Sequence, residues 1–516
     1  MRETSHSITT RLRRFGGIAL CAAAVAATGP AGAQGFTNLE SQVCEKTLAN
    51  GLKVILLPRR NAPVISMVTY ADVGGVDENQ NATGLAHIFE HMAFKGTTSI
   101  GARDFAKEAA AMQKEDETFL ALRAERLRRP KPDPAKLKEL EETFKAAQAE
   151  AQKEVVPNEV GEILEREGAQ GLNAFTAFDQ TVYHYSLPSN KLQLWSALET
   201  DRFSHPVLRE FYKEKDVIME ERRMGESQPT QRLIDDFMAV AFKASMYRSF
   251  VIGHMSDLRG ITRDQAKAWF AKYYGAKNLT AVIVGDIDPA EAMPVLERTL
   301  GTIPPGEKPG PVITQEPPQR SEKRLSMEDP SQPILIVAYH KPDITDPDHA
   351  AYEATRDILA GGRSSRLYKA LVKEKKLAIA VGAITQLGQK YPGLFIFYAV
   401  PNKGKTNGEC EAAIYEQIDL LKTEPATQEE LAGVKARAKS QFLDTIGSNM
   451  GLAQELANAQ NLQGDWREMF RWLGRIDQVT AADVQRVSKK TFVKMNRTVG
   501  MIETAKEPAN PENSGS

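Results

Sequence analysis

In the N-terminal part of the chain, short runs of apolar residues are separated by residues that favour turns. Two apolar runs, 52–57 and 64–73, predict β-strands, because such runs bounded by turn residues are typical of buried strands. Gly74 and Gly75 interrupt the pattern, and polar residues follow as far as Gly84. The apolar pattern that begins after Gly84 indicates a helix. We therefore expect two strands, a turn and a helix in that order.

The helix expected after Gly84 carries His87, Glu90 and His91 in the order H-x-x-E-H. Residues four apart lie one turn above each other on a helix, so both imidazoles can reach one metal ion with Glu90 beside it. Two histidine ligands and a carboxylate that takes the proton from a zinc-bound water form the arrangement of a zinc peptidase. A chance pattern is the alternative, so the motif needs a fitting structural setting.

A third metal ligand has to come from elsewhere in the chain. Catalytic zinc sites use three protein ligands, commonly two His and one Glu, and leave one position for water. In EKDVIMEERR, Glu214 and Glu221 are seven residues apart, which is two helical turns, so they project from the same face. Glu221 could bind the metal and Glu214 could support it. A solvated acidic helix is the alternative, and composition alone favours it.

The later part of the chain contains an internal repeat. The stretch 261–284 aligns without a gap with 479–502, at an offset of 218 residues, and the alignment pairs Asn278 with Asn496. Each copy predicts a helix capped by Thr and followed by a strand of β-branched residues. Between the copies, 303–319 is rich in Pro and Gly and indicates a linker. The chain is therefore expected to consist of two related halves.

A charged segment from about 112 to 160 is rich in Ala, Glu, Lys and Leu and is interrupted by Pro130, Pro132 and Pro134. This composition predicts an inserted helical hairpin. Its apolar positions, such as Leu120 and Leu127, could form a partner surface, but packing of the two helices on each other is the simpler alternative. Because the insertion lies between the H-x-x-E-H motif and Glu221, the spacing cannot identify the third ligand.

The first 33 residues have the features of an export signal. Arg11, Arg13 and Arg14 precede an apolar stretch, 18–27, and Ala31-Gly32-Ala33 supplies a small-residue cleavage site. We therefore expect a mature chain that begins at Gln34 and is periplasmic or secreted. A retained anchor is the alternative, but the stretch is too short to span a membrane, and no later segment reaches that length.

Charge and cysteine content narrow the classes of partner. The net charge of −1 and the pI near 6.8 give no electrostatic reason to expect nucleic acid or an anionic membrane surface. A basic run, 123–131, is flanked by acidic stretches. Cys44 and Cys410 are the cysteines that follow the leader, one in each half, so we expect two free thiols and no disulfide framework.

Four blocks together resemble the pitrilysin or insulinase-type zinc metallopeptidases, within them the branch of the mitochondrial processing peptidase catalytic subunit. The blocks are HIFEHMAFKGT, GLNAFTAFDQTVYHYSLP, EKDVIMEE and VIVGDIDPAEA, and they occur in the family's order. The resemblance implies an α+β fold of two related halves, each with a mainly antiparallel sheet flanked by helices, that enclose a peptide chamber. Four regions are accordingly expected: a signal peptide (1–33), a zinc-binding half (34–302), a linker (303–319) and a related half without metal (320–516).

The resemblance also implies roles for the motif residues. His87, His91 and Glu221 match the ligands of one zinc ion per chain. Glu90 matches the general base, and Glu214 matches the second acidic residue near the site, which the family uses in catalysis.

Asn173 and Ala174 match the strand that pairs with the substrate backbone in the family. The implied activity is that of a zinc endopeptidase acting on unfolded peptides or extended segments, because addition of the substrate as a strand gives affinity through main-chain hydrogen bonds. A non-catalytic peptide-binding or scaffold subunit of the same family is the alternative, although the intact H-x-x-E-H motif favours the enzyme.

The segment 359–381 departs from the family's pattern. Self-sufficient members carry an Arg and a Tyr seven residues apart that help to bind substrate, whereas this chain has Val372 and Ile379 at the matching positions. Arg366 and Tyr368 lie nearby, but they are two residues apart. We therefore expect a heterodimer with a related subunit that lacks the zinc motif and supplies the Arg and the Tyr. A homodimer, or a monomer that clamps peptides by other residues, is the alternative.

Overall fold

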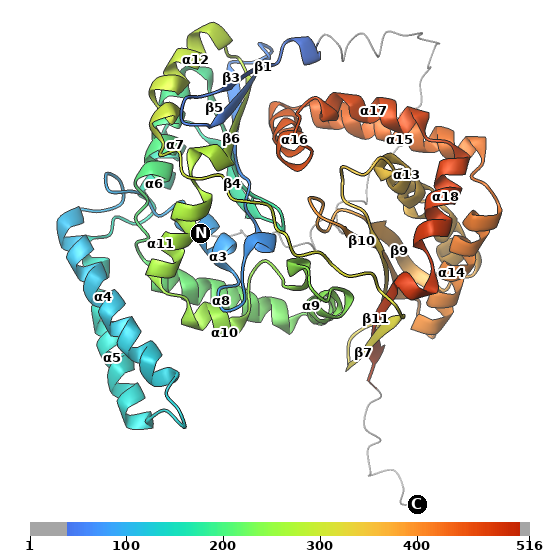
Figure 1. Ribbon diagram of the computed structural model, residues 1–516, viewed down its shortest axis with the longest axis horizontal. Helices are drawn as coiled ribbons and strands as arrows, with labels where there is room; N and C mark the ends of the chain where they lie inside the picture. Colours follow the sequence, from blue (N-terminus) through green and yellow to red (C-terminus); the bar gives the residue numbers. More distant parts are fainter. Residues whose placement is uncertain (1–38, 506–516) are drawn as a thin grey trace, which may run out of the picture. The chain divides into compact units, whose positions relative to one another are not determined.

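The computed structural model describes residues 39–505, and a compact unit that begins at Gln42 contains two β-sheets flanked by helices (Figure 1). This is the α+β class expected from the sequence. The export signal expected at 1–33, including its cleavage site, lies outside the described residues. Within 39–505, no helix is both long enough and apolar enough to cross a membrane.

The first sheet has six strands in the order β1, β2, β6, β3, β5, β4. Their bounds are β1 Cys44–Thr47, β2 Lys53–Pro58, β3 Val64–Ala71, β4 Gln170–Thr176, β5 Thr181–Pro188 and β6 Leu279–Gly285. Strands β2 and β6 run parallel, and the other neighbours run antiparallel. The two predicted apolar runs form β2 and β3, which are covered on both faces and therefore read as nearly continuous apolar sequence.

The second sheet repeats this pairing with five strands in the order β7, β11, β8, β10, β9. Their bounds are β7 Lys323–Asp329, β8 Ile334–Lys341, β9 Ala378–Ile384, β10 Gly393–Pro401 and β11 Arg497–Thr504. Strands β7 and β11 are parallel, as β2 and β6 are, and the remaining pairs are antiparallel. When the two strand orders are aligned, β9 is therefore the edge strand of the second sheet that corresponds to β4 in the first.

The helices are distributed over both halves. In the first half they are α3 Leu85–Met92, α4 Phe105–Arg126, α5 Pro134–Ala151, α6 Glu159–Arg166, α7 Leu192–Ser204, α8 Phe211–Ser227, α9 Pro229–Ala241, α10 Met255–Gly260, α11 Arg263–Tyr273 and α12 Pro289–Arg298. In the second half they are α13 His349–Ala360, α14 Asn407–Thr423, α15 Gln428–Ile446, α16 Asn449–Leu462, α17 Glu468–Gln478 and α18 Ala481–Thr491.

The two copies of the repeat fold alike. Helix α11 precedes β6, and α18, which begins 218 residues after α11, precedes β11. The side-chain amide of Asn278 donates to the backbone carbonyl five residues before it at 2.9 Å, and Asn496 does the same at 3.0 Å. The internal duplication predicted from the sequence is confirmed, and the same side chain fixes the turn between helix and strand in both copies.

The halves exchange one helix each. Helix α9 of the first half packs on β11 and β7, and α16 of the second half packs on β6 and β3. Gly500 of β11 allows this approach, because a Cβ at that position would lie 2.6 Å from the ring of Phe237 in α9. Each sheet therefore buries one face under a helix that the other half supplies.

The chain between the halves, 303–322, contains no helix or strand. Glu316 fastens this stretch to the first half by accepting hydrogen bonds from three successive backbone N–H groups, at 2.7–2.9 Å, in the segment that follows α9. The predicted linker, 303–319, lies within it.

The charged segment expected to form a hairpin folds into α4 and α5, which pack against each other. Helix α4 begins at Phe105, earlier than the expected start near 112, because Asp104 caps it by accepting from the backbone N–H of Lys107 at 3.2 Å. The buried residues of α4 end at Leu122, and those of α5 lie only near its C-terminus. The root of the hairpin is therefore embedded in the fold, and its far end is exposed.

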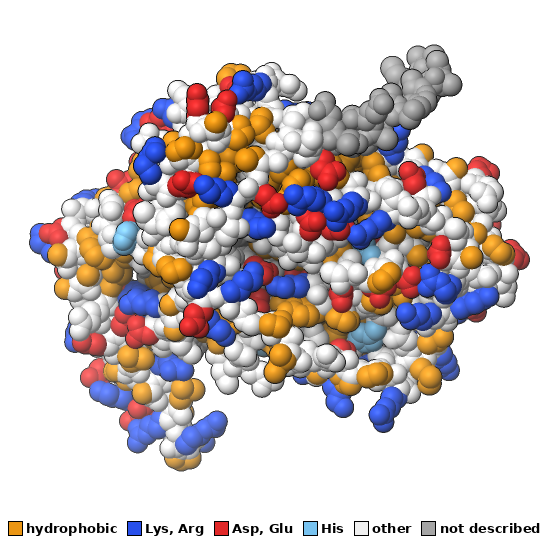
Figure 2. Space-filling view, turned by 45° about the horizontal axis from the view of Figure 1, so that its top comes forward, with side chains coloured by type: hydrophobic (Ala, Val, Ile, Leu, Met, Phe, Trp, Pro, Cys, Tyr) orange, Lys and Arg blue, Asp and Glu red, His pale blue; other side chains and the backbone are white. Residues whose placement is uncertain are grey.

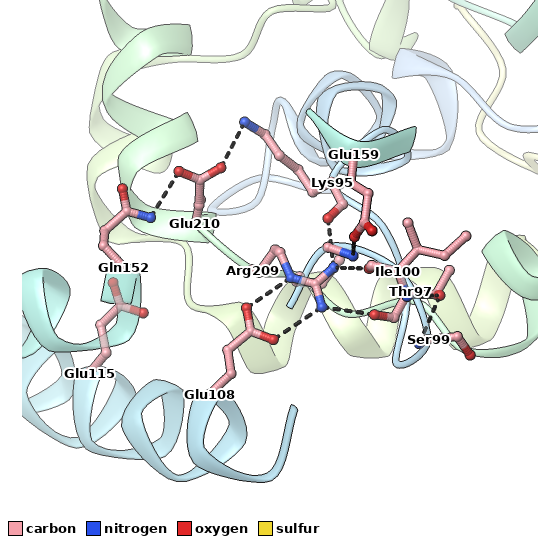
Figure 3. Close-up of polar contacts among 12 residues, drawn as sticks. Lys95, Thr97, Ser99, Ile100, Glu108, Glu115, Gln152, Glu159, Arg209 and Glu210 are labelled. Atoms are coloured by element: carbon pink, nitrogen blue, oxygen red, sulfur yellow. Dashed lines mark hydrogen bonds and ion pairs between the residues drawn. The ribbon is translucent and has the colours of Figure 1, made fainter. Parts of the chain in front are cut away.

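A buried arginine joins the hairpin root to the loop after α3 (Figure 3). Arg209 donates to both carboxylate oxygens of Glu108 in α4, at 2.8 and 3.0 Å. Its remaining N–H groups donate at 2.7 Å to the backbone carbonyls of Lys95, Thr97 and Ile100. Both charged groups are almost fully buried, so losing one partner would cost about 3–5 kcal/mol.

Lys215 is buried in α8 beside the hairpin root, and we expect it to make the free energy of unfolding increase as the pH rises above 7. Its ammonium donates to the carbonyl of Ile261 at 2.5 Å and lies 4.4 Å from the ring centre of Phe119, and burial lowers its pKa from 10.5 to about 7. A lysine with a depressed folded pKa contributes stability that is fully present above the unfolded pKa and lost as pH falls through the folded pKa.

The free energy of unfolding of the wild type, relative to Lys215→Met, should therefore rise by roughly 2 kcal/mol from pH 7 to pH 9. Urea denaturation at the two pH values measures this difference. Lys267→Met, at an exposed position of α11, is the matched control and should show no such change. A constant difference between Lys215→Met and wild type over this range would contradict the prediction.

Candidate metal centre

Helix α3 presents the H-x-x-E-H residues on the face opposite its apolar side. Gly84 precedes the helix with φ of +95°, a backbone conformation that favours glycine. The carboxylate of Glu78 accepts from the N–H groups of Gly84 at 2.7 Å and Ala86 at 2.9 Å, which satisfies donors of the first turn. The other helix face is buried in the core through five residues: Leu85, Ala86, Ile88, Phe89 and Met92.

Helix α8 brings Glu214 against His91. The Nδ1 atom of His91 lies 3.0 Å from Oε1 of Glu214, which leaves Nε2 of the ring for another partner. Burial alone would lower the pKa of His91, but the hydrogen bond to Glu214 and the neighbouring carboxylates raise it. Burial opposes ionisation of Glu214, yet the hydrogen bonds from His91 and Lys95 lower the pKa of Glu214 to about 2. This carboxylate is therefore ionised and fixes the orientation of the imidazole.

Glu221, two turns further along α8, faces both histidines. Its Oε2 lies 3.8 Å from Nε2 of His87 and 3.9 Å from Nε2 of His91. Burial lowers the pKa of His87 to about 3, so this imidazole is neutral at physiological pH. Within the described part of the chain, these three residues form a group that could hold a metal, with ligand atoms within 4.8 Å of one another.

The donor set fits a zinc ion. The two nitrogen–oxygen distances exceed hydrogen-bonding range, so Glu221 forms no hydrogen bond with either imidazole. Donors at zinc-ligand distances in a tetrahedral site lie about 3.4 Å apart, a few tenths of an ångström closer than here. Two imidazoles and one carboxylate also leave a fourth position open, as catalytic zinc sites do.

Glu90 lies beside this group and is held by a strand of the first sheet. The hydroxyl of Thr176, the last residue of β4, donates to Oε2 of Glu90 at 2.6 Å. Burial raises the pKa of Glu90 above its ordinary value, although the hydrogen bond from Thr176 opposes this shift. A carboxylate whose pKa moves toward neutrality is better suited to take up and return a proton.

Strand β4 also carries the two residues matched to substrate binding. Asn173 pairs with His184 and Ala174 with Tyr183 of β5, while the opposite edge of β4 has no neighbouring strand among residues 39–505. The side chain of Asn173 is exposed and that of Ala174 is buried. The free edge of β4 therefore ends at Thr176, directly beside Glu90.

The positions that lack the family's Arg and Tyr lie at the edge of the second sheet. Val372 is in a π-helical segment, 368–374, and Ile379 is on β9 with 55% of its surface exposed. Arg366 is not available as a substitute, because its guanidinium forms a two-pronged pair with Glu430 of α15 at 2.7 and 2.8 Å.

The sequence did not identify a second layer of polar residues behind His91. The ammonium of Lys95 lies 2.6 Å from Glu214. It also lies 3.3 Å from Glu210, and Glu210 accepts from Gln152 at 2.8 Å (Figure 3). Gln152 follows α5, so these contacts connect the root of the hairpin to a candidate metal ligand. Lys95 lies beyond the end of α3, so its spacing from His91 in the sequence gave no signal for these contacts.

We expect Lys95→Met to weaken zinc retention about tenfold, because Glu214 loses the ammonium that fixes it against His91. Zinc occupancy against increasing concentrations of a competing chelator measures the effect. Lys107→Met, at an exposed position of α4, is the control and should retain zinc like the wild type. Equal occupancy in the two variants would show that Lys95 has no positioning role.

Two family models match most of the chain. The model described as Insulinase (Peptidase family M16) matches residues 53–121 and 142–253, and the model described as Peptidase M16 inactive domain matches 260–438. This chain belongs to the insulinase family of peptidases. The expected family is confirmed, and the first model includes every candidate residue of the metal centre.

Relatives and solved structures agree with this assignment. The zinc protease PqqE of Helicobacter pylori is 25% identical over 456 residues, 86% of this chain and 89% of that protein. A probable mitochondrial-processing peptidase subunit beta of Arabidopsis thaliana is 22% identical over 459 residues, 86% and 75% of the two chains. The crystal structure of a protease from Helicobacter pylori has the same fold, with a TM-score of 0.73 at 22% identity over 89% of this chain and 99% of that one.

Proposed function

We propose that this chain is a zinc-dependent endopeptidase that hydrolyses unfolded peptides or extended segments. The observation that carries the proposal is the convergence of His87, His91 and Glu221 beside Glu90. The carboxylate of Glu90 accepts a hydrogen bond from Thr176, the last residue of the edge strand β4. Relatives named zinc proteases support it. The leader expected at 1–33 would place the activity in the periplasm or outside the cell.

The residues of the site divide the chemistry among them. A zinc ion, one per chain, would polarise the scissile carbonyl and lower the pKa of water to about 7. His87, His91 and Glu221 would hold it, and Glu214 keeps His91 oriented through Nδ1. Glu90 takes the proton of the attacking water and passes it to the nitrogen of the leaving amine. Thr176 aims the Glu90 carboxylate throughout this transfer.

Substrate selection follows from the free edge of β4. An extended peptide that adds as a further strand gains main-chain hydrogen bonds, with Asn173 and Ala174 on the strand that it joins. Residues of a folded protein already use those groups in their own structure. The enzyme should therefore cleave unfolded segments and spare folded domains.

A related partner subunit is part of the proposal. Val372 and Ile379 offer no side-chain donors to a peptide backbone, so a second subunit would supply an Arg and a Tyr. Relatives named as beta subunits of mitochondrial-processing peptidase support pairing with another subunit. A homodimer or a self-sufficient monomer is the competing arrangement.

The deciding experiment is cleavage of an unfolded fluorogenic peptide by the purified chain, alone and with a co-expressed related subunit that lacks H-x-x-E-H. We expect zinc-dependent cleavage, inhibited by a chelator, that increases at least about tenfold with the partner. Full activity of the chain alone would refute the heterodimer but keep the enzyme. Zinc binding without cleavage in either form would assign a non-catalytic peptide-binding or scaffold role instead.

A further inference from the structure

The far end of the hairpin is strongly basic. Residues 123–138, here called the hairpin tip, contain seven Lys or Arg and two Asp or Glu, a net charge of +5. The whole chain has a net charge of −1, so the rest of it carries −6. The near-neutral net charge is therefore the sum of a basic tip and an acidic remainder. The absence of an electrostatic reason to expect an anionic membrane surface, which was inferred from the net charge, does not apply to this segment.

The hairpin tip is open to solvent. None of its residues is buried, and each residue from 126 to 131 is exposed. Leu127 lies within this run with 64% of its surface exposed. Figure 2 shows the hairpin projecting at the lower left, with Lys and Arg side chains on both sides of an apolar end. An exposed leucine among cationic side chains is thus presented at the end of a protruding element.

The two acidic residues of the tip are occupied by local structure. Glu125 accepts from the backbone N–H of Asp133 at 2.7 Å and pairs with Arg128 at 3.3 Å, and Asp133 caps the first turn of α5. Two cations of the tip are paired with acidic residues just beyond it, Arg126 with Glu141 and Lys136 with Glu139, each at 3.0 Å, whereas Arg129 and Lys131 form no ion pair with any described residue. The positive charge is therefore only partly neutralised within the chain and faces outward.

The family fold does not require this segment. The insulinase-family model leaves residues 122–141 unmatched, and that gap encloses the whole hairpin tip. Helices α4 and α5 could turn with any polar sequence, so packing of the hairpin does not explain why basic residues gather at its end. The charge and the exposed Leu127 are features of this chain and call for a partner outside it.

We propose that the hairpin tip docks the protein on an anionic lipid surface. A narrow, convex tip with no cavity matches a plane of negative headgroups, where each nearby Lys or Arg strengthens binding about fivefold. Leu127 can enter the boundary between headgroups and acyl chains while the flanking arginines remain at headgroup level. An acidic protein is less well matched, because a small convex turn offers it little area to bury.

Vesicle flotation tests the proposal on the chain without residues 1–33, which removes the apolar leader as a second source of binding. We expect binding to phosphatidylcholine vesicles that contain phosphatidylglycerol, no binding to phosphatidylcholine alone, and weakening with added salt. Arg128→Glu, Arg129→Glu and Lys131→Glu combined should weaken binding by about a hundredfold or more.

The matched control reverses three exposed lysines elsewhere, Lys373→Glu, Lys403→Glu and Lys439→Glu, with the same change in net charge. It should retain binding within about threefold of the wild type. Retention shows that the position of the charge matters. If the control loses as much as the tip variant, net charge alone governs binding and the docking site is refuted.

The apolar contribution is tested separately by Leu127→Asn, which should weaken binding about tenfold, against Leu443→Asn at an exposed position of α15. Wild-type binding by the three-residue tip variant would overturn the proposal. So would equal binding to neutral vesicles. Binding of the wild type to polyglutamate but not to anionic vesicles would assign an acidic protein partner and reject the lipid surface.

Discussion

Replacing Glu90 by Gln is expected to leave zinc bound and to lower peptide hydrolysis by about a thousandfold. The amide cannot take up the proton of the attacking water, whereas His87, His91 and Glu221 are untouched. The amide introduced by Glu90→Gln can still accept the hydrogen bond from Thr176 through its carbonyl oxygen, so the geometry beside the ligands is preserved. The loss should therefore be one of rate and not of folding.

Zinc content and turnover of the same preparation separate these effects. Thr176→Val is the matched control, because it removes the hydrogen bond to Glu90 and leaves the carboxylate in place. It should lose far less activity than Glu90→Gln. Turnover near the wild-type level in Glu90→Gln, with zinc retained, would remove Glu90 from the mechanism.

The second large effect concerns the third ligand. Glu221→Gln should weaken zinc binding by more than about a hundredfold, since the ionised oxygen that faces both imidazoles becomes a poor neutral donor. Glu220→Gln should bind zinc as the wild type does. Adjacent helical residues point about 100° apart, and Glu220 is turned outward to pair with Arg223.

Both variants remove one carboxylate from the same helix and change the net charge equally, so a difference in zinc affinity between them results from the position of the carboxylate. Chelator competition gives the two zinc affinities, and thermal unfolding of the metal-free proteins tests whether the fold is intact. We expect the metal-free forms of the wild type and Glu221→Gln to unfold at nearly the same temperature, because Glu221 makes no short hydrogen bond with any described residue. Equal zinc affinity of the two variants would refute the ligand assignment.

Local and periodic features were predictable from the sequence. The apolar runs that became β2 and β3, the helix with H-x-x-E-H and the 218-residue offset all depend on spacing along the chain. The same holds for the seven-residue spacing of Glu214 and Glu221, which places them on the same side of α8 against the histidines. These predictions needed only the geometry of a helix or a strand.

Features made by distant residues were not predictable in this way. Lys95, Glu210 and Gln152 meet only when the loop after α3, the start of α8 and the end of α5 are brought together. The start of α4 was placed too late because composition marked the charged segment, whereas the Asp104 cap marks the helix. The exchange of α9 and α16 leaves no periodic signal, since either helix could cover its own sheet.

That exchange links the metal centre to the second half. Helix α8, which carries Glu214 and Glu221, is separated from α9 by a single residue, Gln228, and α9 is anchored on the second sheet. Helix α3, which carries the histidines, is anchored in the first. Phe211 and Ile218 hold α8 itself in the first core, so we expect a shift of the second sheet, such as one that makes room for a peptide, to reach Glu221 only through α9 and the C-terminal end of α8. Metal geometry in this protein should report how far the two halves are apart.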